Sequence, residues 1–185
     1  MGEINLLIIF LNIMTIEEYK KIADPLSQRT LVFLVHNDEV LLGKKKSGFG
    51  KGKLLGIGGS VEENEIVEKA MIREAIEEIG VIPKNYARVA TLNFYFPYED
   101  NAEKWNQQVC VYKSDQWDGD IIESNEILPK WFKISEIPFD LMWSDARYWL
   151  SDVLAGEMLI GDFLFDKNLE VEENKIRKVL SWDFN

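Results

Sequence analysis

The chain of 185 residues is 46% hydrophobic and 12% aromatic, and its 32 Asp and Glu against 21 Lys and Arg give a net charge of −11. This length and composition indicate one globular domain and exclude a disordered chain, and the acidic balance argues against a nucleic-acid polymer as the main partner. The single cysteine, Cys110, and the single histidine, His36, argue against a zinc site, so a bound metal would be held by carboxylates.

The first 28 residues are interpreted as an N-terminal extension of a domain that spans residues 29–185. Within it, the apolar run at residues 6–14 is too short to span a bilayer and lacks the flanking residues of a signal peptide. This run is either an extra strand or helix that covers an apolar patch, or an upstream artefact ahead of a biological start at Met14. Thr15 is a suitable N-cap for a short helix over residues 16–23.

The rest of the chain alternates between strand and helix patterns. Strands are expected, in chain order, at residues 30–35, 40–42, 54–57, 87–96, 107–113, 130–133, 163–165 and 170–179. Helices are expected at residues 65–79 and 142–154, and the first of these ends at Gly80. Helices that interleave with hairpin-linked strands indicate an α/β (α+β) domain with a mixed sheet.

The helix at residues 65–79 carries glutamates on one face. At about 100° per residue, Glu74, Glu77 and Glu78 share an arc of about 100°. Like charges at this spacing repel one another, which leaves two interpretations. The glutamates form a solvated acidic surface, or they bind a divalent cation whose charge relieves the repulsion.

The residues around this helix favour the cation site. Gly58 and Gly59 form a loop in which the backbone can approach a ligand closely, and Arg73 can hold a carboxylate with its bidentate fork. The stretch from Gly59 to Gly80 resembles the Nudix box of the Nudix hydrolases, with every fixed Gly, Glu and Arg present. One apolar position departs from the motif, because Ala75 replaces a larger aliphatic residue.

This resemblance implies a Nudix-type α/β/α sandwich around a mixed β-sheet. It also implies Mg²⁺-dependent, or Mn²⁺-dependent, hydrolysis of a nucleoside diphosphate linked to another group. Its pattern assigns metal binding and the general base to Glu74, Glu77 and Glu78, and supporting roles to Glu65 and Arg73. The pattern leaves open which glutamate is the base. Two further metal ligands are implied, the carbonyl of Gly58 and the carboxylate of Glu126.

Further motifs, at residues 44–52, 131–132, 137–139 and 142–149, are similar to those of animal-type oxidised purine nucleoside triphosphatases, which include 8-oxo-dGTP diphosphatase. They imply that Trp143 stacks on the base, Asp145 hydrogen-bonds its edge and Lys45 lies at the pocket mouth. The implied pocket is also lined by three phenylalanines, Phe49, Phe94 and Phe96. The plainer alternatives are core packing for the aromatic residues, a solvated loop lysine for Lys45 and a surface position for Glu126.

Two departures leave the substrate open. Leu55 stands where these relatives have an Asn, and Ala146 stands where they have a second Asp, and both positions recognise the base edge in the relatives. Arg147 is a new charge expected beside the pocket and would favour an acceptor-rich edge.

The expected activity is cleavage of an oxidised purine nucleoside triphosphate to a monophosphate and pyrophosphate. One alternative is hydrolysis of a dinucleoside polyphosphate, a nucleotide sugar or ADP-ribose. The other is a nucleotide-binding Nudix module without catalysis. A lone cysteine fits a reducing compartment, so a cytoplasmic monomer or homodimer that binds neither membrane nor nucleic acid is expected.

Overall fold

The computed structural model describes residues 14–182, apart from 24, 49 and 101. Most of the N-terminal apolar run, and Phe49, lie outside the described residues. The helices are α2 (Ile16–Tyr19), α3 (Val67–Ile79), α4 (Ala102–Trp105) and α5 (Ala146–Leu154), with short 3₁₀ turns η1 (Ile134–Glu136) and η2 (Phe139–Leu141). The strands are β1 (Ser27–His36), β2 (Glu39–Lys45), β3 (Leu54–Leu55), β4 (Ile82–Tyr95), β5 (Gln107–Asp118), β6 (Ile127–Lys133), β7 (Met158–Phe165) and β8 (Val171–Val179).

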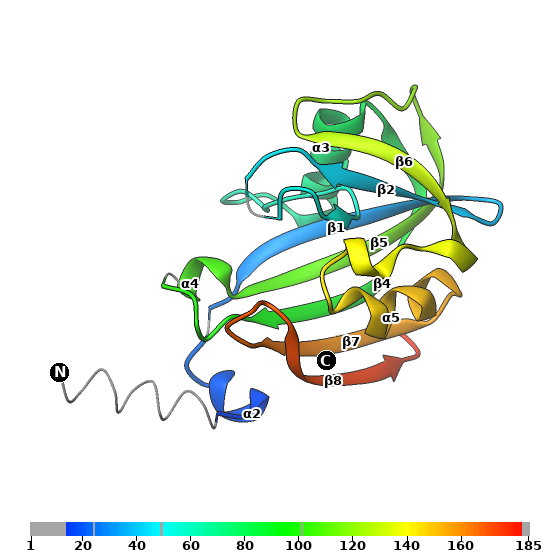
Figure 1. Cartoon of the computed structure of the whole chain (residues 1–185). Coiled ribbons are helices and arrows are strands. Elements are labelled where there is room, and N and C mark those ends of the chain that lie inside the picture. The colour runs from blue at the N-terminus through cyan, green and yellow to red at the C-terminus, as the bar shows by residue number, and fades with distance from the viewer. Residues whose placement is uncertain (1–13, 24, 49, 101, 183–185) are drawn as a thin grey trace.

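The strands form one eight-stranded sheet (Figure 1). Its order is β3-β2-β1-β5-β4-β7-β8. The remaining strand, β6, pairs with the edge of β2 opposite to the one that pairs with β3. The pairs β1·β5 and β4·β7 are parallel, and the other pairs of described strands are antiparallel. The prediction of a mixed sheet is therefore confirmed.

Two helices cover opposite faces of the sheet, as the alternation of side chains along β1 requires. Val32 and Leu34 pack with α3 residues such as Met71, whereas Phe33 packs with Trp149 of α5. The two cores are thus separated by the sheet, and the α/β/α arrangement expected from the sequence is present. Figure 1 shows α3 beside β1 and β6, and α5 beside β4 and β7.

Several element boundaries differ from the expected ones. The helix α3 begins at Val67, two residues later than expected, because Ile66 has an extended backbone conformation and Glu65 closes a turn with the Glu62 carbonyl. The helix α5 begins at Ala146 rather than at Met142, because Met142 is extended after η2 and the residues that follow form a turn in which Ala146 donates its N–H to the Trp143 carbonyl. The strands β4 and β5 are longer than expected because they pair with each other along almost their full length.

The described part of the extension packs on the edge of the domain. In α2, Thr15 donates its backbone N–H to the Glu18 carboxylate at 2.9 Å, the bond that the Glu of a capping box makes, and its hydroxyl donates to the same carboxylate oxygen at 2.9 Å. The helix ends at Tyr19, earlier than the expected residue 23. Its apolar side contacts Tyr95 and Leu164 of the sheet. Among the described residues, no helix is long and apolar enough to cross a membrane.

Candidate active site

The loop at Gly58 and Gly59 is tied to the glutamate face of α3. Gly58 donates its N–H to Glu78 at 2.9 Å. Gly59 packs against Glu74 so closely that an added Cβ would lie 2.5 Å from a carboxylate oxygen. Gly80 ends α3 in the left-handed conformation, with φ of 76°, so that the chain turns directly into β4. These contacts hold the loop backbone beside two of the glutamates.

Arg73 joins the loop and the helix through its guanidinium group. It donates to both carboxylate oxygens of Glu65, at 3.0 and 2.9 Å, and to the carbonyl of Ser60 at 2.9 Å. It also donates to Glu74 at 2.9 Å and to Glu77 at 3.4 Å. The hydrogen bonds to Glu65 raise the pKa of Arg73 above its ordinary value. Arg73 therefore remains a cation that orients carboxylates on α3.

Two glutamates of α3, Glu74 and Glu78, are largely shielded from solvent, whereas the Glu77 side chain is 59% exposed. The pKa of Glu78 is raised to about 7, chiefly by burial and in smaller part by the charges of Glu74 and Glu126, while the N–H of Gly58 and the charge of Lys45 act in the opposite direction. Burial also raises the pKa of Glu74, with Glu77 and Glu126 acting in the same direction. Glu126, which is distant in sequence, is thus brought into the field of the α3 carboxylates.

This donor set fits a hard divalent cation, because carboxylate oxygens suit Mg²⁺ and Mn²⁺ and a cation would relieve their repulsion. Within residues 14–182 as described, no three His, Cys, Asp or Glu side chains already form a metal-binding cluster. Arg73 forms ion pairs with Glu74 and Glu77 in this structure.

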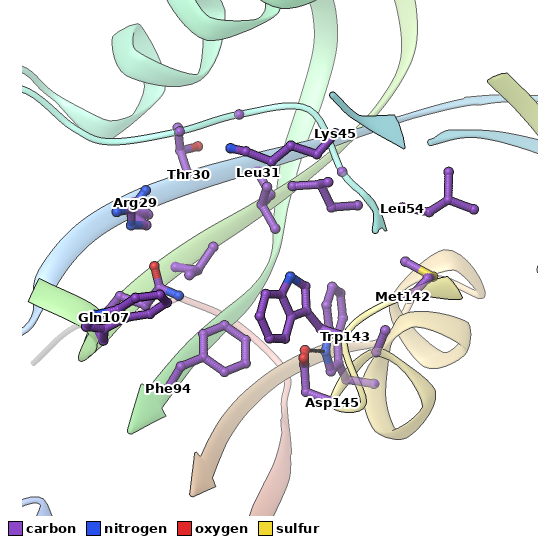
Figure 2. Close-up of a pocket in the computed structure, with 18 of the residues that line it drawn as sticks. Arg29, Thr30, Leu31, Lys45, Leu54, Phe94, Gln107, Met142, Trp143 and Asp145 are labelled. Carbon is purple, nitrogen blue, oxygen red and sulfur yellow. Dashed lines mark hydrogen bonds between the residues drawn. The ribbon is translucent and has the colours of Figure 1, made fainter. Parts of the chain in front are cut away.

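A cavity of about 300 Å³ begins at this loop and extends over the other face of the sheet. Its lining includes most of the side chains expected to bind a nucleotide (Figure 2). These are Lys45, Phe94, Phe96, Trp143 and Asp145. Gly58 and Gly59 line the same cavity, so the loop beside the glutamates and the aromatic pocket form one continuous site.

The aromatic residues of the cavity also belong to the core. Phe96 stacks on Phe165 with centroids 4.6 Å apart, and Phe94 stacks on Phe163 at 5.5 Å. Trp143 contacts Phe165 edge-on and lies 5.7 Å from the ammonium of Lys53. Core packing and cavity lining are therefore compatible, because Phe94, Phe96 and Trp143 pack in or against the core and also line the cavity.

Asp145 is a buried acid in the cavity wall. It accepts a hydrogen bond from the indole N–H of Trp149 at 2.8 Å. Burial raises the pKa of Asp145 to about 6, while the Trp149 hydrogen bond and Lys53 lower it. An acid with this pKa can present either an acceptor or a donor to a base edge near neutral pH.

The three residues that depart from the pattern of the relatives, Leu55, Ala146 and Arg147, do not all line the cavity. Leu55 and Ala146 both line the cavity. Arg147 was expected beside the pocket, but it is not part of the cavity lining and lies 3.5 Å from the exposed Asp140. The helix α5 turns position 147 away from the buried face that carries Ala146 and Trp149.

The polar cavity residues that sequence reasoning missed include Arg29, Thr30 and Gln107. They come from the starts of β1 and β5, which are parallel neighbours. The alternation of Arg29 with the cavity residue Leu31, and of Gln107 with Val109, is the signal that could have found two of them.

The two loop glycines should respond differently to alanine. Gly59→Ala pushes on a flexible carboxylate and should preserve the melting temperature while lowering kcat by about 10²-fold, since it displaces Glu74. Gly58→Ala should destabilise the fold by about 3 kcal/mol, because Gly58 has φ of 150° and a Cβ there would collide with the Thr30 carbonyl. Thermal melting and kcat, measured on both variants, test this. An unchanged kcat in Gly59→Ala would contradict the placement of Glu74.

The fold and this site define the protein as a hydrolase. A family model, the NUDIX domain, matches residues 26–153, and the chain belongs to the Nudix family. It is 36% identical to an oxidized purine nucleoside triphosphate hydrolase of Danio rerio, over 81% of this chain and 94% of that protein. It is 33% identical to the protein of the same name from Mus musculus, over 83% and 96% of the two chains.

Solved structures agree on the fold. The crystal structure of a MutT protein from Bacillus halodurans superposes with a TM-score of 0.68 and 22% identity, covering 82% of this chain and 97% of that one. At this identity the likeness concerns the fold alone.

Proposed function

We propose that the protein is a Mg²⁺-dependent pyrophosphohydrolase that cleaves oxidised purine nucleoside triphosphates to a monophosphate and pyrophosphate. One observation carries the proposal: a single cavity is lined by Gly58 and Gly59, beside the glutamates of α3, and by Trp143 and Asp145. A ligand that fills it would have its base among aromatic rings and its phosphates near the carboxylates. The named relatives from Danio rerio and Mus musculus support the substrate class.

The cation would be held by Glu74, Glu77 and Glu78, with the Gly58 carbonyl and Glu126 as further ligands. When bound, it would neutralise phosphate oxygens and lower the pKa of a water molecule. Mn²⁺ has the same ligand preference and should substitute.

The remaining roles belong to side chains of the chain itself. Trp143 stacks on the base and Asp145 hydrogen-bonds its edge, while Phe94 and Phe96 form the apolar wall. Lys45 supplies positive charge between the base and the α3 carboxylates. A carboxylate oxygen of α3 accepts the proton of the attacking water, and Arg73 keeps that carboxylate oriented.

A second candidate keeps the chemistry and changes the substrate. Leu55 and Ala146 bring apolar groups into the cavity wall where the relatives have an amide and a carboxylate. The pocket therefore has fewer polar groups with which to reject other bases. A dinucleoside polyphosphate, a nucleotide sugar or ADP-ribose is the alternative substrate.

A nucleotide panel tests the proposal. Purified protein with Mg²⁺ is incubated with 8-oxo-dGTP, 2-hydroxy-dATP, the normal dNTPs, ADP-ribose, a nucleotide sugar and a dinucleoside polyphosphate, and the products are identified. We expect an oxidised purine triphosphate to be turned over fastest, with pyrophosphate rather than phosphate released. Failure to hydrolyse any triphosphate would refute the proposal. Tight nucleotide binding in a calorimeter without any turnover would instead indicate a binding module.

Removing the cation should abolish turnover and weaken nucleotide binding. The chain has a net charge of −11, and the α3 carboxylates repel phosphates unless a cation is present. Turnover and affinity are measured with EDTA and after restoring Mg²⁺ or Mn²⁺. A nucleotide affinity that EDTA leaves unchanged would show that the carboxylates do not face the phosphates.

The proposal extends to the setting of the enzyme. Its substrates are free nucleotides, and it binds neither nucleic-acid polymers nor membranes. We place it in the cytoplasm, as a monomer or a homodimer. Gel filtration with light scattering distinguishes these two states.

A further inference from the structure

Two polar side chains of the cavity come from neighbouring parallel strands. In the register of β1 and β5, Ser27 lies opposite Gln107 and Arg29 lies opposite Val109. Because side chains of paired residues in a parallel ladder share a face, Arg29 and Gln107 lie on the face that also carries Leu31 and Val109. All four line the cavity.

The side chain of Arg29 has a buried and unsatisfied hydrogen-bond donor. Its Nε atom is buried and has no hydrogen-bond partner in the described part of the chain. The same holds for the hydroxyl of Thr30, whose residue is 0% exposed. Burial lowers the pKa of Arg29 and the negative charge of Glu74 raises it. Arg29 is therefore a cation whose buried Nε–H has no acceptor among the described residues. A buried donor without a partner costs free energy that a ligand acceptor can recover.

The side of the cavity opposite Arg29 carries an acidic side chain, Asp145. Figure 2 shows Arg29 and Gln107 on one side of the cavity and Asp145 on the other, with Phe94 and Trp143 between them. A purine held among the rings thus meets an acid at one edge and a cation at the other. The N–H donors of guanine lie on its Watson–Crick edge, which suits Asp145. The five-membered ring, with C8, lies at the far edge.

We propose that Arg29 is a specificity-determining residue that recognises an oxygen on C8 of the purine, with Gln107 beside it. The inference rests on the proposed function, and it assigns preference for the oxidised base to residues outside the Nudix box. An unmodified purine has only C–H at this position and leaves the guanidinium without its acceptor. An 8-oxopurine supplies a carbonyl oxygen there, and a hydrogen bond to a charged donor is stronger than one to a neutral donor.

The same guanidinium could instead bind a phosphate oxygen, because Glu74 acts on it electrostatically. The two assignments predict different substrate dependence. Recognition of a C8 oxygen affects only substrates that carry it, whereas phosphate binding affects all triphosphates alike.

The test compares the wild-type protein with Arg29→Met, which keeps the length of the side chain and removes its charge and donors. The substrates are 8-oxo-dGTP and 8-oxo-dATP, which carry the C8 oxygen, and dGTP and 2-hydroxy-dATP, which do not. Arg177→Met is the matched control, because Arg177 is an exposed arginine on β8 outside the cavity lining. Arg29→Lys keeps the charge and serves if Arg29→Met does not fold, as judged by thermal melting.

We expect Arg29→Met to lower kcat/KM about 10- to 100-fold for the two 8-oxo substrates and less than about threefold for the other two. Most of the loss should fall in KM. Arg29→Lys should show the same pattern with a smaller loss, and Arg177→Met should show none. An equal loss on all four substrates, or no loss, overturns the inference. If the wild-type protein hydrolyses no triphosphate, the proposed function fails first, and the two failures are thereby distinguished.

Discussion

Replacing both Glu77 and Glu78 with glutamine should lower kcat by about 10³-fold and leave the fold intact. The reason is that the amides keep the length of the side chains but remove two negative charges from the proposed metal site, where a cation contributes several kcal/mol to the transition state. Glutamine at position 78 still has an oxygen that can accept the N–H of Gly58, which Glu78 accepts at 2.9 Å. Initial rates at saturating Mg²⁺ and nucleotide, together with a circular-dichroism melt, measure both parts.

The matched control is Glu62→Gln/Glu63→Gln. These two glutamates are exposed and precede α3, so this variant loses the same charge without touching the site. It should retain wild-type kcat within about twofold. If the two double variants have the same kcat, the glutamate face of α3 is not the catalytic face, and the acidic surface is the better interpretation.

Asp145→Asn should make the protein more stable at neutral pH and less active. Burial raises the pKa of Asp145 to about 6 from an ordinary value of 3.8, so the folded state binds this proton more tightly than the unfolded state does. The wild-type protein therefore loses stability as the pH rises between these two values, by up to about 3 kcal/mol. An asparagine does not titrate and escapes this loss, and its oxygen can still accept the N–H of Trp149.

The stability gain should consequently be present at pH 7.5 and absent at pH 4, as urea unfolding at both values will show. In the same variant, kcat/KM should fall about 10- to 100-fold, since a charged hydrogen bond to the base edge is lost. Asp140→Asn is the control, because the Asp140 side chain is 97% exposed. A gain of equal size at both pH values would mean that Asp145 is not the titrating group.

Local signals in the sequence determined much of the architecture. The hairpin β1–β2, the helix α3 and its end at Gly80 depend on alternation, helical periodicity and one left-handed glycine, which are properties of neighbouring residues. The boundaries that depend on packing were less well predicted. For example, β4 begins at Ile82, next to the end of α3, because its partner β5 extends to Asp118.

The sequence by itself determined the family and the set of glutamates. The Nudix box lies in one continuous segment, so the spacing of its residues can be recognised without knowledge of the tertiary structure. The tertiary structure added neighbours that were not predicted from the sequence. Glu126 was implied as a metal ligand by the resemblance, and the structure brings it within the field of α3 from the position just before β6. Arg29 and Gln107 were not predicted, and they line one cavity from neighbouring parallel strands that are far apart in sequence. The burial that raises the pKa of Asp145 likewise arises from packing between elements. Such neighbours depend on sheet order and register, which a linear pattern does not encode.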